Sequence, residues 1–186
     1  MTPQRNIRWG IPVKSIGPLA SLNSKQRDGL SVAEVLKETL NKTYRESIMA
    51  LITAIANDFF AACETGKGWE VCKTYCAPNA TFAAQAEPLA GIKTLAEYAD
   101  WMKGLMTIMP DGSYEVKSFA TDTERNNVAA YAVFSGTHAG PGGPCEPTGK
   151  KTTSDYVYVM QFTDDKISHM TKIWHSGIAL KELGWA

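Results

Sequence analysis

From Ser31 onward, the spacing of apolar residues along this chain is mainly that of helices, and it changes to that of strands near residue 113. Before that point apolar residues recur every three or four positions, as in helices, and Ser31 with Glu34 and Thr94 with Glu97 form capping-box signatures. After it, apolar and polar residues alternate, as in strands. The predicted helices are Val32 to about Leu40, Tyr44 to Glu64, Trp69 to Cys76 and Thr94 to about Met109.

The strand-like segments are enriched in β-branched and aromatic residues, and Asn126-Asn127 and Asp164-Asp165 are placed to form tight turns between them. Helices first and strands afterwards predict an α+β domain, with an antiparallel sheet covered by helices on one face. The predicted strands are Ala80 to Ala84, Tyr114 to Thr121, Val128 to His138, Thr153 to Phe162 and Lys166 to His175.

The first part of the chain differs from the rest. Residues Met1 to Asp28 are polar, contain Pro and Gly, and show no clear period, so we expect an arm that lies on a partner or on the domain itself. We therefore divide the chain into an extension with a short helix, residues 1–44, and a folded domain, residues 45–186.

Composition excludes some classes of partner. The chain has 19 basic and 19 acidic residues, which argues against binding to nucleic acid. The most apolar run, Ile48 to Phe60, is interrupted by Asn57 and Asp58 and is too short to cross a bilayer, and the first residues lack a signal-peptide pattern. We therefore expect a cytoplasmic protein without a membrane partner.

The cysteines do not indicate a metal centre. Cys72 and Cys76 lie four residues apart, a spacing that could supply two ligands, but no His or Asp cluster is nearby. Buried free thiols are favoured over a metal site, and we expect no metal or cofactor.

The last two predicted strands form a hairpin whose register decides which residues face a cavity. If Thr163 lies opposite Lys166 and the ladder is regular, one face of the sheet mixes aromatic, His, Thr and apolar side chains, as a ligand pocket does. The opposite face would suit a homodimer interface; its residues are Asp155, Val157, Val159, Gln161, Ser168, Met170, Lys172 and Trp174. A slip of one residue would exchange the two faces.

This register gives the candidate site. His169 and His175 are the candidate acid or base, although about 20 Å separates them along a regular strand, so at most one would act on a substrate. His138 could contact a ligand or anchor the following loop, and Phe82, Tyr98 and Trp101 could line the cavity or belong to the ordinary core. The candidate substrate-binding residues are Tyr156, Tyr158, Met160, Thr171, Ile173, Trp174, Phe82, Tyr98, Trp101 and His138.

One connection is long and rich in Gly and Pro. The segment AGPGGPCEPTGKK, Ala139 to Lys151, follows His138 and is too long for a simple hairpin turn. It is either a functional lid or a solvent-exposed crossover, and the sequence leaves both open.

The second half of the chain resembles the SnoaL-like polyketide cyclase family of the nuclear transport factor 2-like superfamily. The resemblance rests on FSGTHAGPGGPCEPTGK, on DDKISHMTKIW and on the terminal LKELGW, and it covers roughly Arg45 to Ala186. It implies a cone-shaped curved antiparallel sheet packed against N-terminal helices, an internal ligand cavity, and a homodimer formed through the sheet. It also implies aldol ring closure by acid/base chemistry without a cofactor.

The residues that carry this chemistry in the family are not all present here. The cyclases have an aspartate after the tryptophan of the last strand, where this chain has His175. In an ungapped alignment of the hairpin, Lys172 takes the place of the aspartate and Tyr158 that of a histidine on the preceding strand. Two functions therefore remain: a cofactor-independent cyclase-like enzyme acting on a small, partly apolar carbonyl compound, or a small-molecule-binding or scaffold protein of the same fold.

Overall fold

The computed structural model describes residues 31–186, so the predicted arm, Met1 to Asp28, lies outside the described residues. The chain divides into a first unit, Met1–Thr39, and a second unit, Leu40–Ala186. The second unit contains the sheet, the core and the candidate site described below.

Helix α1 runs from Val32–Glu64 as one continuous helix, where the sequence pattern predicted two. Its start is confirmed: the Glu34 carboxylate accepts a hydrogen bond from the Ser31 backbone amide, and the Ser31 hydroxyl accepts one from the Glu34 amide. The polar residues between Leu40 and Tyr44 are compatible with a helix. Asn and Thr lower the helix propensity, but they do not interrupt the backbone hydrogen bonds of a helix. Not every apolar residue at helical spacing is buried, since Leu51 is exposed. The buried residues are Ile52, Ala56, Phe59, Phe60, Ala62, Cys63 and Glu64.

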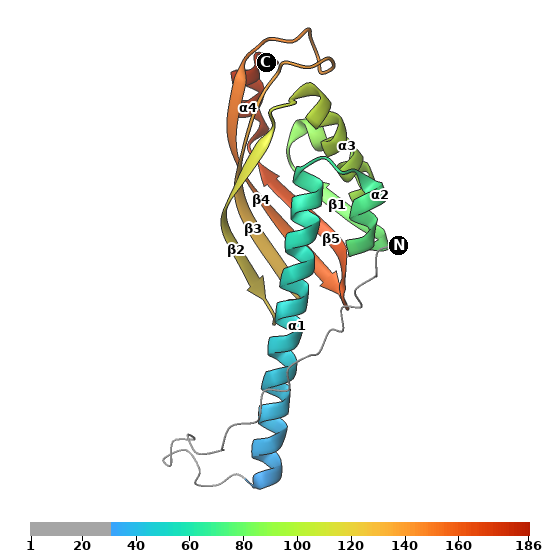
Figure 1. Cartoon of the computed structure of the whole chain (residues 1–186), viewed down its shortest axis with the longest axis vertical. Helices are drawn as coiled ribbons and strands as arrows, with labels where there is room; N and C mark the ends of the chain where they lie inside the picture. Colours follow the sequence, from blue (N-terminus) through green and yellow to red (C-terminus); the bar gives the residue numbers. More distant parts are fainter. Residues whose placement is uncertain (1–30) are drawn as a thin grey trace, which may run out of the picture. The chain divides into compact units, whose positions relative to one another are not determined.

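Three further helices complete the domain. Helix α2, Trp69–Cys72, continues into a 3-10 turn, Lys73–Tyr75, and the predicted capping box of Thr94 and Glu97 starts helix α3, Leu95–Ile108. Helix α4, Ser176–Leu183, was not predicted. Figure 1 shows α1, α2 and α3 on one side of the sheet and α4 near one end of it, beside the C-terminus.

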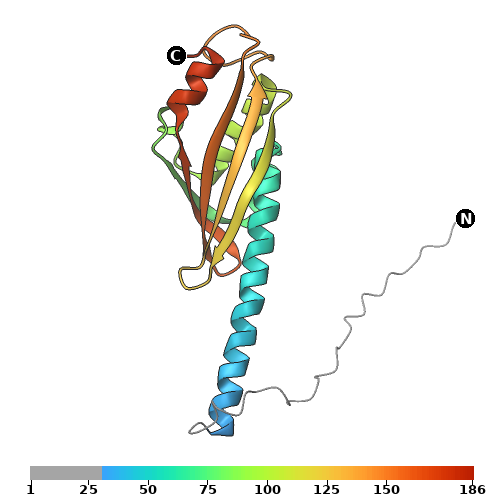
Figure 2. The ribbon, with the colours of Figure 1, turned by 90° about the vertical axis from the view of Figure 1, so that its left-hand side faces the viewer.

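The sheet has five strands in the order β1-β5-β4-β3-β2. The strands are β1 (Cys76–Ala84), β2 (Ser113–Asp122), β3 (Asn127–Thr137), β4 (Lys151–Thr163) and β5 (Lys166–Trp174). Four of them form an antiparallel meander as predicted, whereas β1 pairs with β5 in parallel. The curved sheet is open, and in Figure 2 β3 and β4 lie in front of α3. The predicted α+β class and cone-like sheet are confirmed.

The β4–β5 hairpin begins as predicted but then departs from a regular ladder. Thr163 pairs with Lys166 and Phe162 with Ile167, and Asp164 adopts the left-handed backbone conformation of a tight turn. Gln161 then pairs with His169, so Ser168 is an extra residue that forms a β-bulge. The predicted pairing of Met160 with His169 is therefore wrong.

The bulge reverses the faces predicted for the rest of β5. Met160 pairs with Met170, Tyr158 with Lys172 and Tyr156 with Trp174. The open face of the sheet instead includes His169, Thr171 and Ile173 from β5 with Asp155, Val157, Val159 and Gln161 from β4. A homodimer through this face stays a prediction.

Helix α1 is long and apolar enough, by length and composition alone, to cross a membrane. The core helix of a soluble protein passes the same test, and residues from Ile52 to Glu64 contribute to the domain core. The helix is thus weak evidence for a membrane, and the cytoplasmic location stays a prediction.

Candidate functional site

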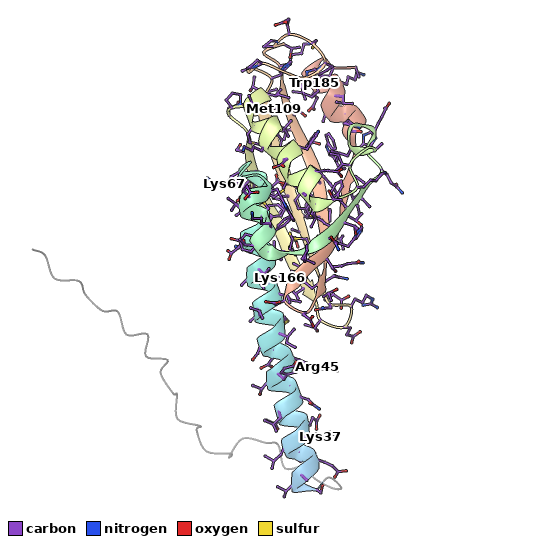
Figure 3. All side chains as sticks on the ribbon, turned by 90° about the vertical axis from the view of Figure 1, so that its right-hand side faces the viewer. Lys37, Arg45, Lys67, Met109, Lys166 and Trp185 are labelled. Atoms are coloured by element: carbon purple, nitrogen blue, oxygen red, sulfur yellow. The ribbon has the colours of Figure 1, made fainter. Side chains whose placement is uncertain are left out.

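A cavity lies between the helices and the inner face of the sheet. Side chains from α1, α3, β3, β4, β5, α4 and the C-terminal residues line it, and most of the lining is aromatic or aliphatic. Its volume of about 60 Å³ leaves room for on the order of four water molecules, so it suits a small ligand. Figure 3 shows two lining residues, Met109 and Trp185, near the same end of the domain.

The cavity is lined by one acidic and one basic side chain. Glu64, in the last turn of α1, and Lys172, near the end of β5, both line the cavity, and each is almost fully buried. Burying either charge alone would be costly, so both side chains need partners.

Two buried tyrosines connect the lysine to the carboxylate. The Lys172 ammonium donates to the Tyr98 hydroxyl at 2.8 Å, and the Tyr158 hydroxyl donates to Glu64 Oε1. The Tyr98 and Tyr158 hydroxyls are hydrogen-bonded to each other. Because Tyr158 gives its only proton to Glu64, Tyr98 must donate to Tyr158, and the bonds run in one direction from Lys172 to Glu64.

Burial opposes the charged form of both Glu64 and Lys172. Burial raises the pKa of the Glu64 carboxyl, with the positive charge of Lys172 acting in the opposite direction, and burial lowers the pKa of Lys172. Moving one proton along each of the three hydrogen bonds would convert the ammonium and carboxylate into an amine and a carboxylic acid. We call Lys172, Tyr98, Tyr158 and Glu64 the proton chain.

Aromatic rings enclose the lysine nitrogen. The Tyr156 ring centroid lies 4.8 Å from Lys172 Nζ and the Trp174 centroid 5.1 Å. The rings of Tyr98, Tyr158 and Trp101 lie at 5.3, 5.5 and 5.9 Å. Aromatic rings stabilise a cation less than water does. Because these rings exclude water, the charged form of the lysine loses stabilisation overall.

Tyr156 places a hydroxyl at the cavity, near the Glu64 carboxylate but without a hydrogen bond of standard geometry to it. Its residue lines the cavity with 3% exposure, and its hydroxyl has no hydrogen-bond partner among residues 31–186. Burial, together with the nearby Glu64 carboxylate, raises the pKa of Tyr156, so the group stays protonated and can donate. A buried hydroxyl that makes no hydrogen bond of standard geometry is uncommon, and this one can donate to a group that enters the cavity.

His138 holds one wall of the cavity in place. Its Nδ1 accepts a hydrogen bond from Trp185 Nε1 at 2.9 Å and one from the Thr148 amide at 3.3 Å. Its Nε2 therefore carries the proton and donates to the Gly142 carbonyl at 3.1 Å. The histidine ties the Gly/Pro loop to the C-terminal Trp185, as the loop-anchoring alternative proposed.

The predicted site residues fall into four groups. Tyr156, Trp101 and Trp174 line the cavity, and Tyr98 and Tyr158 lie directly behind it in the proton chain. Phe82, Met160 and His138 are buried without lining it.

The remaining candidates lie elsewhere. His169, Thr171 and Ile173 lie on the open face, where His169 Nδ1 is 2.7 Å from the Thr81 hydroxyl. His175 is exposed at the start of α4. Neither histidine lines this cavity, and a catalytic role for either stays a prediction.

Glu64 and Lys172 are the functional candidates that the sequence reasoning missed. One signal for Glu64 was available: an acidic residue in the last helical turn opposes the helix dipole, and it follows Phe60 by four positions on the buried face. The signal for Lys172 was its alignment, without gaps, with the aspartate of the family. The predicted register, however, placed Lys172 on the face of the sheet opposite the cavity.

The cavity side chains do not form a metal site. Among residues 31–186, no group of three His, Cys, Asp or Glu side chains is placed to hold a metal ion. Cys72 and Cys76 are buried free thiols, and burial raises the pKa of Cys76 to about 12.

Comparisons with known proteins place the chain in a family. Solved structures share its fold: AclR, a candidate hydroxylase from Streptomyces galilaeus, is 22% identical, with a TM-score of 0.61 over 74% of this chain and 87% of AclR. A candidate SnoaL-like polyketide cyclase from Jannaschia sp. CCS1 is 14% identical, with a TM-score of 0.63 over 75% and 95% of the two chains. An NTF2-like protein from Burkholderia thailandensis E264 is 17% identical, with a TM-score of 0.57 over 71% and 96%.

At these identities the structural likeness shows the fold alone, and no curated protein matches the sequence. The model of the SnoaL-like polyketide cyclase family matches residues 54–179, which include the proton chain and most of the cavity lining. The chain belongs to the SnoaL-like polyketide cyclase family.

Proposed function

We propose that this protein is a cofactor-independent, cyclase-like enzyme that removes a proton next to the carbonyl group of a small, partly apolar substrate. The observation that carries the proposal is the proton chain, which joins a buried amine to a buried carboxyl at the wall of an apolar cavity. Acid/base catalysis requires groups whose pKa values are shifted towards neutrality, and burial shifts Glu64 and Lys172 in that direction.

Each group has a role in this proposal. The Tyr156 hydroxyl donates a hydrogen bond to the substrate carbonyl and stabilises the enolate as negative charge develops on the oxygen. The amine of Lys172 takes the proton from the carbon next to the carbonyl. When the enolate then forms a new bond, as in ring closure, the Lys172 ammonium gives that proton back to the substrate.

The proposal is tested by proton exchange, which does not require the natural substrate. A small ketone such as cyclopentanone is incubated with the protein in D₂O, and loss of the signal from hydrogens next to the carbonyl is followed by NMR. Wild type should accelerate exchange, and Tyr156→Phe should slow it on the order of a hundredfold, as expected for loss of one oxyanion donor.

Tyr131→Phe is the matched control, because the Tyr131 hydroxyl donates to Asp155 on the open face of the sheet. Its exchange rate should equal that of wild type. If wild type gives no acceleration although the ketone binds, the acid/base proposal is wrong.

The aromatic enclosure of Lys172 favours a second function, the binding of an acidic ligand without chemistry. Cation–π contacts stabilise a protonated lysine, which would pair with a ligand carboxylate. In that case small apolar carboxylic acids would bind more tightly than ketones of equal size, and no proton exchange would be seen.

A further inference from the structure

The function proposed above uses Lys172 as a base, but its position also allows covalent chemistry. The amine lines the cavity, lies beside the Tyr156 ring, and belongs to a residue that is 7% exposed. A lysine with these surroundings is the kind that forms Schiff bases with carbonyl compounds.

We propose that Lys172 is a nucleophile whose amine condenses with the ketone or aldehyde carbonyl of the bound substrate to form an imine. This inference rests on the proposed function, because it requires a carbonyl compound in the same cavity. It replaces the enolate of a simple base mechanism with a protein-bound enamine.

The condensation balances without an oxidant, reductant or cofactor. The lone pair of Nζ forms the new N–C bond, and the carbonyl π electrons move to the oxygen. Both hydrogens of the neutral amine finally leave with that oxygen as one molecule of water, which gives the C=N bond. Loss of a proton from the neighbouring carbon, with protonation of the nitrogen, then gives the nucleophilic enamine.

The proton chain supplies the neutral amine that this step requires. An ammonium has no lone pair, so Lys172 must first give up a proton, and the hydrogen bonds through Tyr98 and Tyr158 carry it to Glu64. Burial lowers the pKa of Lys172, which favours the same state. The Tyr156 hydroxyl, without a partner in the described residues, can donate to the oxygen that must leave.

The surrounding residues also protect the imine. Lys172 is enclosed by aromatic side chains, which limits the access of water that would reverse the condensation. Lysines on the surface keep their protons near neutral pH and compete poorly for the carbonyl. Lys166, on the same strand, is a matched control because its ammonium donates to the Thr74 carbonyl and it is part-exposed.

The test uses pentane-2,4-dione, a small diketone whose adduct with an amine absorbs in the near ultraviolet. Wild type is incubated with the diketone at neutral pH, its intact mass is measured, and the modified peptide is located by tandem mass spectrometry. We expect one adduct, with the mass of the diketone less one water, on the peptide containing Lys172. Peptide mapping in wild type keeps the test valid even if a variant folds poorly.

Variants then assign the chemistry. Lys172→Met should abolish the absorbing species and Lys166→Met should leave it unchanged. Glu64→Gln keeps an acceptor for Tyr158 but cannot take up the proton, so adduct formation should slow on the order of a hundredfold. An unmodified Lys172 in the presence of bound diketone, or equal labelling of several surface lysines, would overturn the inference.

The result separates this inference from the proposed function. Ketone proton exchange without an adduct would overturn the imine and leave Lys172 as a general base. An adduct without proton exchange would overturn the acid/base proposal and leave imine formation intact. Absence of both would overturn both.

Discussion

Two neighbouring tyrosines on β4 allow the hydrogen-bond chain to be tested by a pair of equal substitutions. Tyr158 and Tyr156 are buried, lie two positions apart on the same face of the sheet, and differ in their partners. The Tyr158 hydroxyl bonds both Glu64 and Tyr98, whereas the Tyr156 hydroxyl bonds none of the described residues. Changing each to Phe removes one oxygen atom from a similar environment.

The expected cost of Tyr158→Phe follows from the two bonds that it removes. A hydrogen bond to a charged group contributes about 1.5–3 kcal/mol and a neutral one about 1 kcal/mol, so the loss should be about 2–4 kcal/mol. Tyr156→Phe removes a buried hydroxyl that makes no hydrogen bond of standard geometry. The free energy of unfolding should therefore stay the same or rise by up to about 1 kcal/mol.

Equilibrium unfolding in urea, followed by tryptophan fluorescence and far-ultraviolet circular dichroism, measures both values. With a urea dependence of about 2 kcal/mol per molar, Tyr158→Phe should lower the midpoint by about 1–2 M. Equal midpoints for the two variants, or a larger loss for Tyr156→Phe, would refute the assignment of hydrogen bonds in the proton chain.

Two further predictions concern Glu64 and His138. The native pKa of Glu64 is raised above its ordinary value of 4.5, so the native state holds that proton more tightly than the unfolded chain does. The stability of wild type relative to Glu64→Gln should therefore fall as the pH rises above 4.5, and a constant difference in urea midpoints would contradict this. His138→Ala leaves the Trp185 indole and the Thr148 amide without their hydrogen-bond acceptor. The free energy of unfolding should therefore fall by about 2–4 kcal/mol in the same assay, and ketone binding should weaken. Unchanged stability would show that His138 does not hold this wall of the cavity in place.

Local sequence signals predicted much of the fold correctly. The capping box at Thr94 and the turn at Asp164 each depend on a few adjacent residues, and both are present. Helix α4 lacks such a signal, because its N-cap residue, His175, makes no side-chain capping bond. The parallel pairing of β1 with β5 joins residues far apart in the sequence, and no local pattern specifies it.

The candidate site was harder to predict because its chemistry depends on burial. Histidine is the residue type most often used for acid/base chemistry, so sequence alone singled out His169 and His175. Glu64 and Lys172 become candidates for chemistry only when folding removes them from water and connects them through Tyr98 and Tyr158. Sequence could identify the tyrosines as possible cavity residues, but not their partners.

The bulge at Ser168 decides which residue of β5 enters the cavity, and its outcome opposes the ordinary hydrophobic pattern. Lys172 is 7% exposed, whereas its neighbour Ile173 is 61% exposed. Burial of an isoleucine would contribute about 1.5–3 kcal/mol, so hydrophobicity alone favours the opposite orientation at these two positions. Ile167 and Met170 pack into the core, and this fixes which residues of the strand point inward. A strand that buries a lysine and exposes an isoleucine sacrifices stability locally, as expected where a side chain is retained for chemistry.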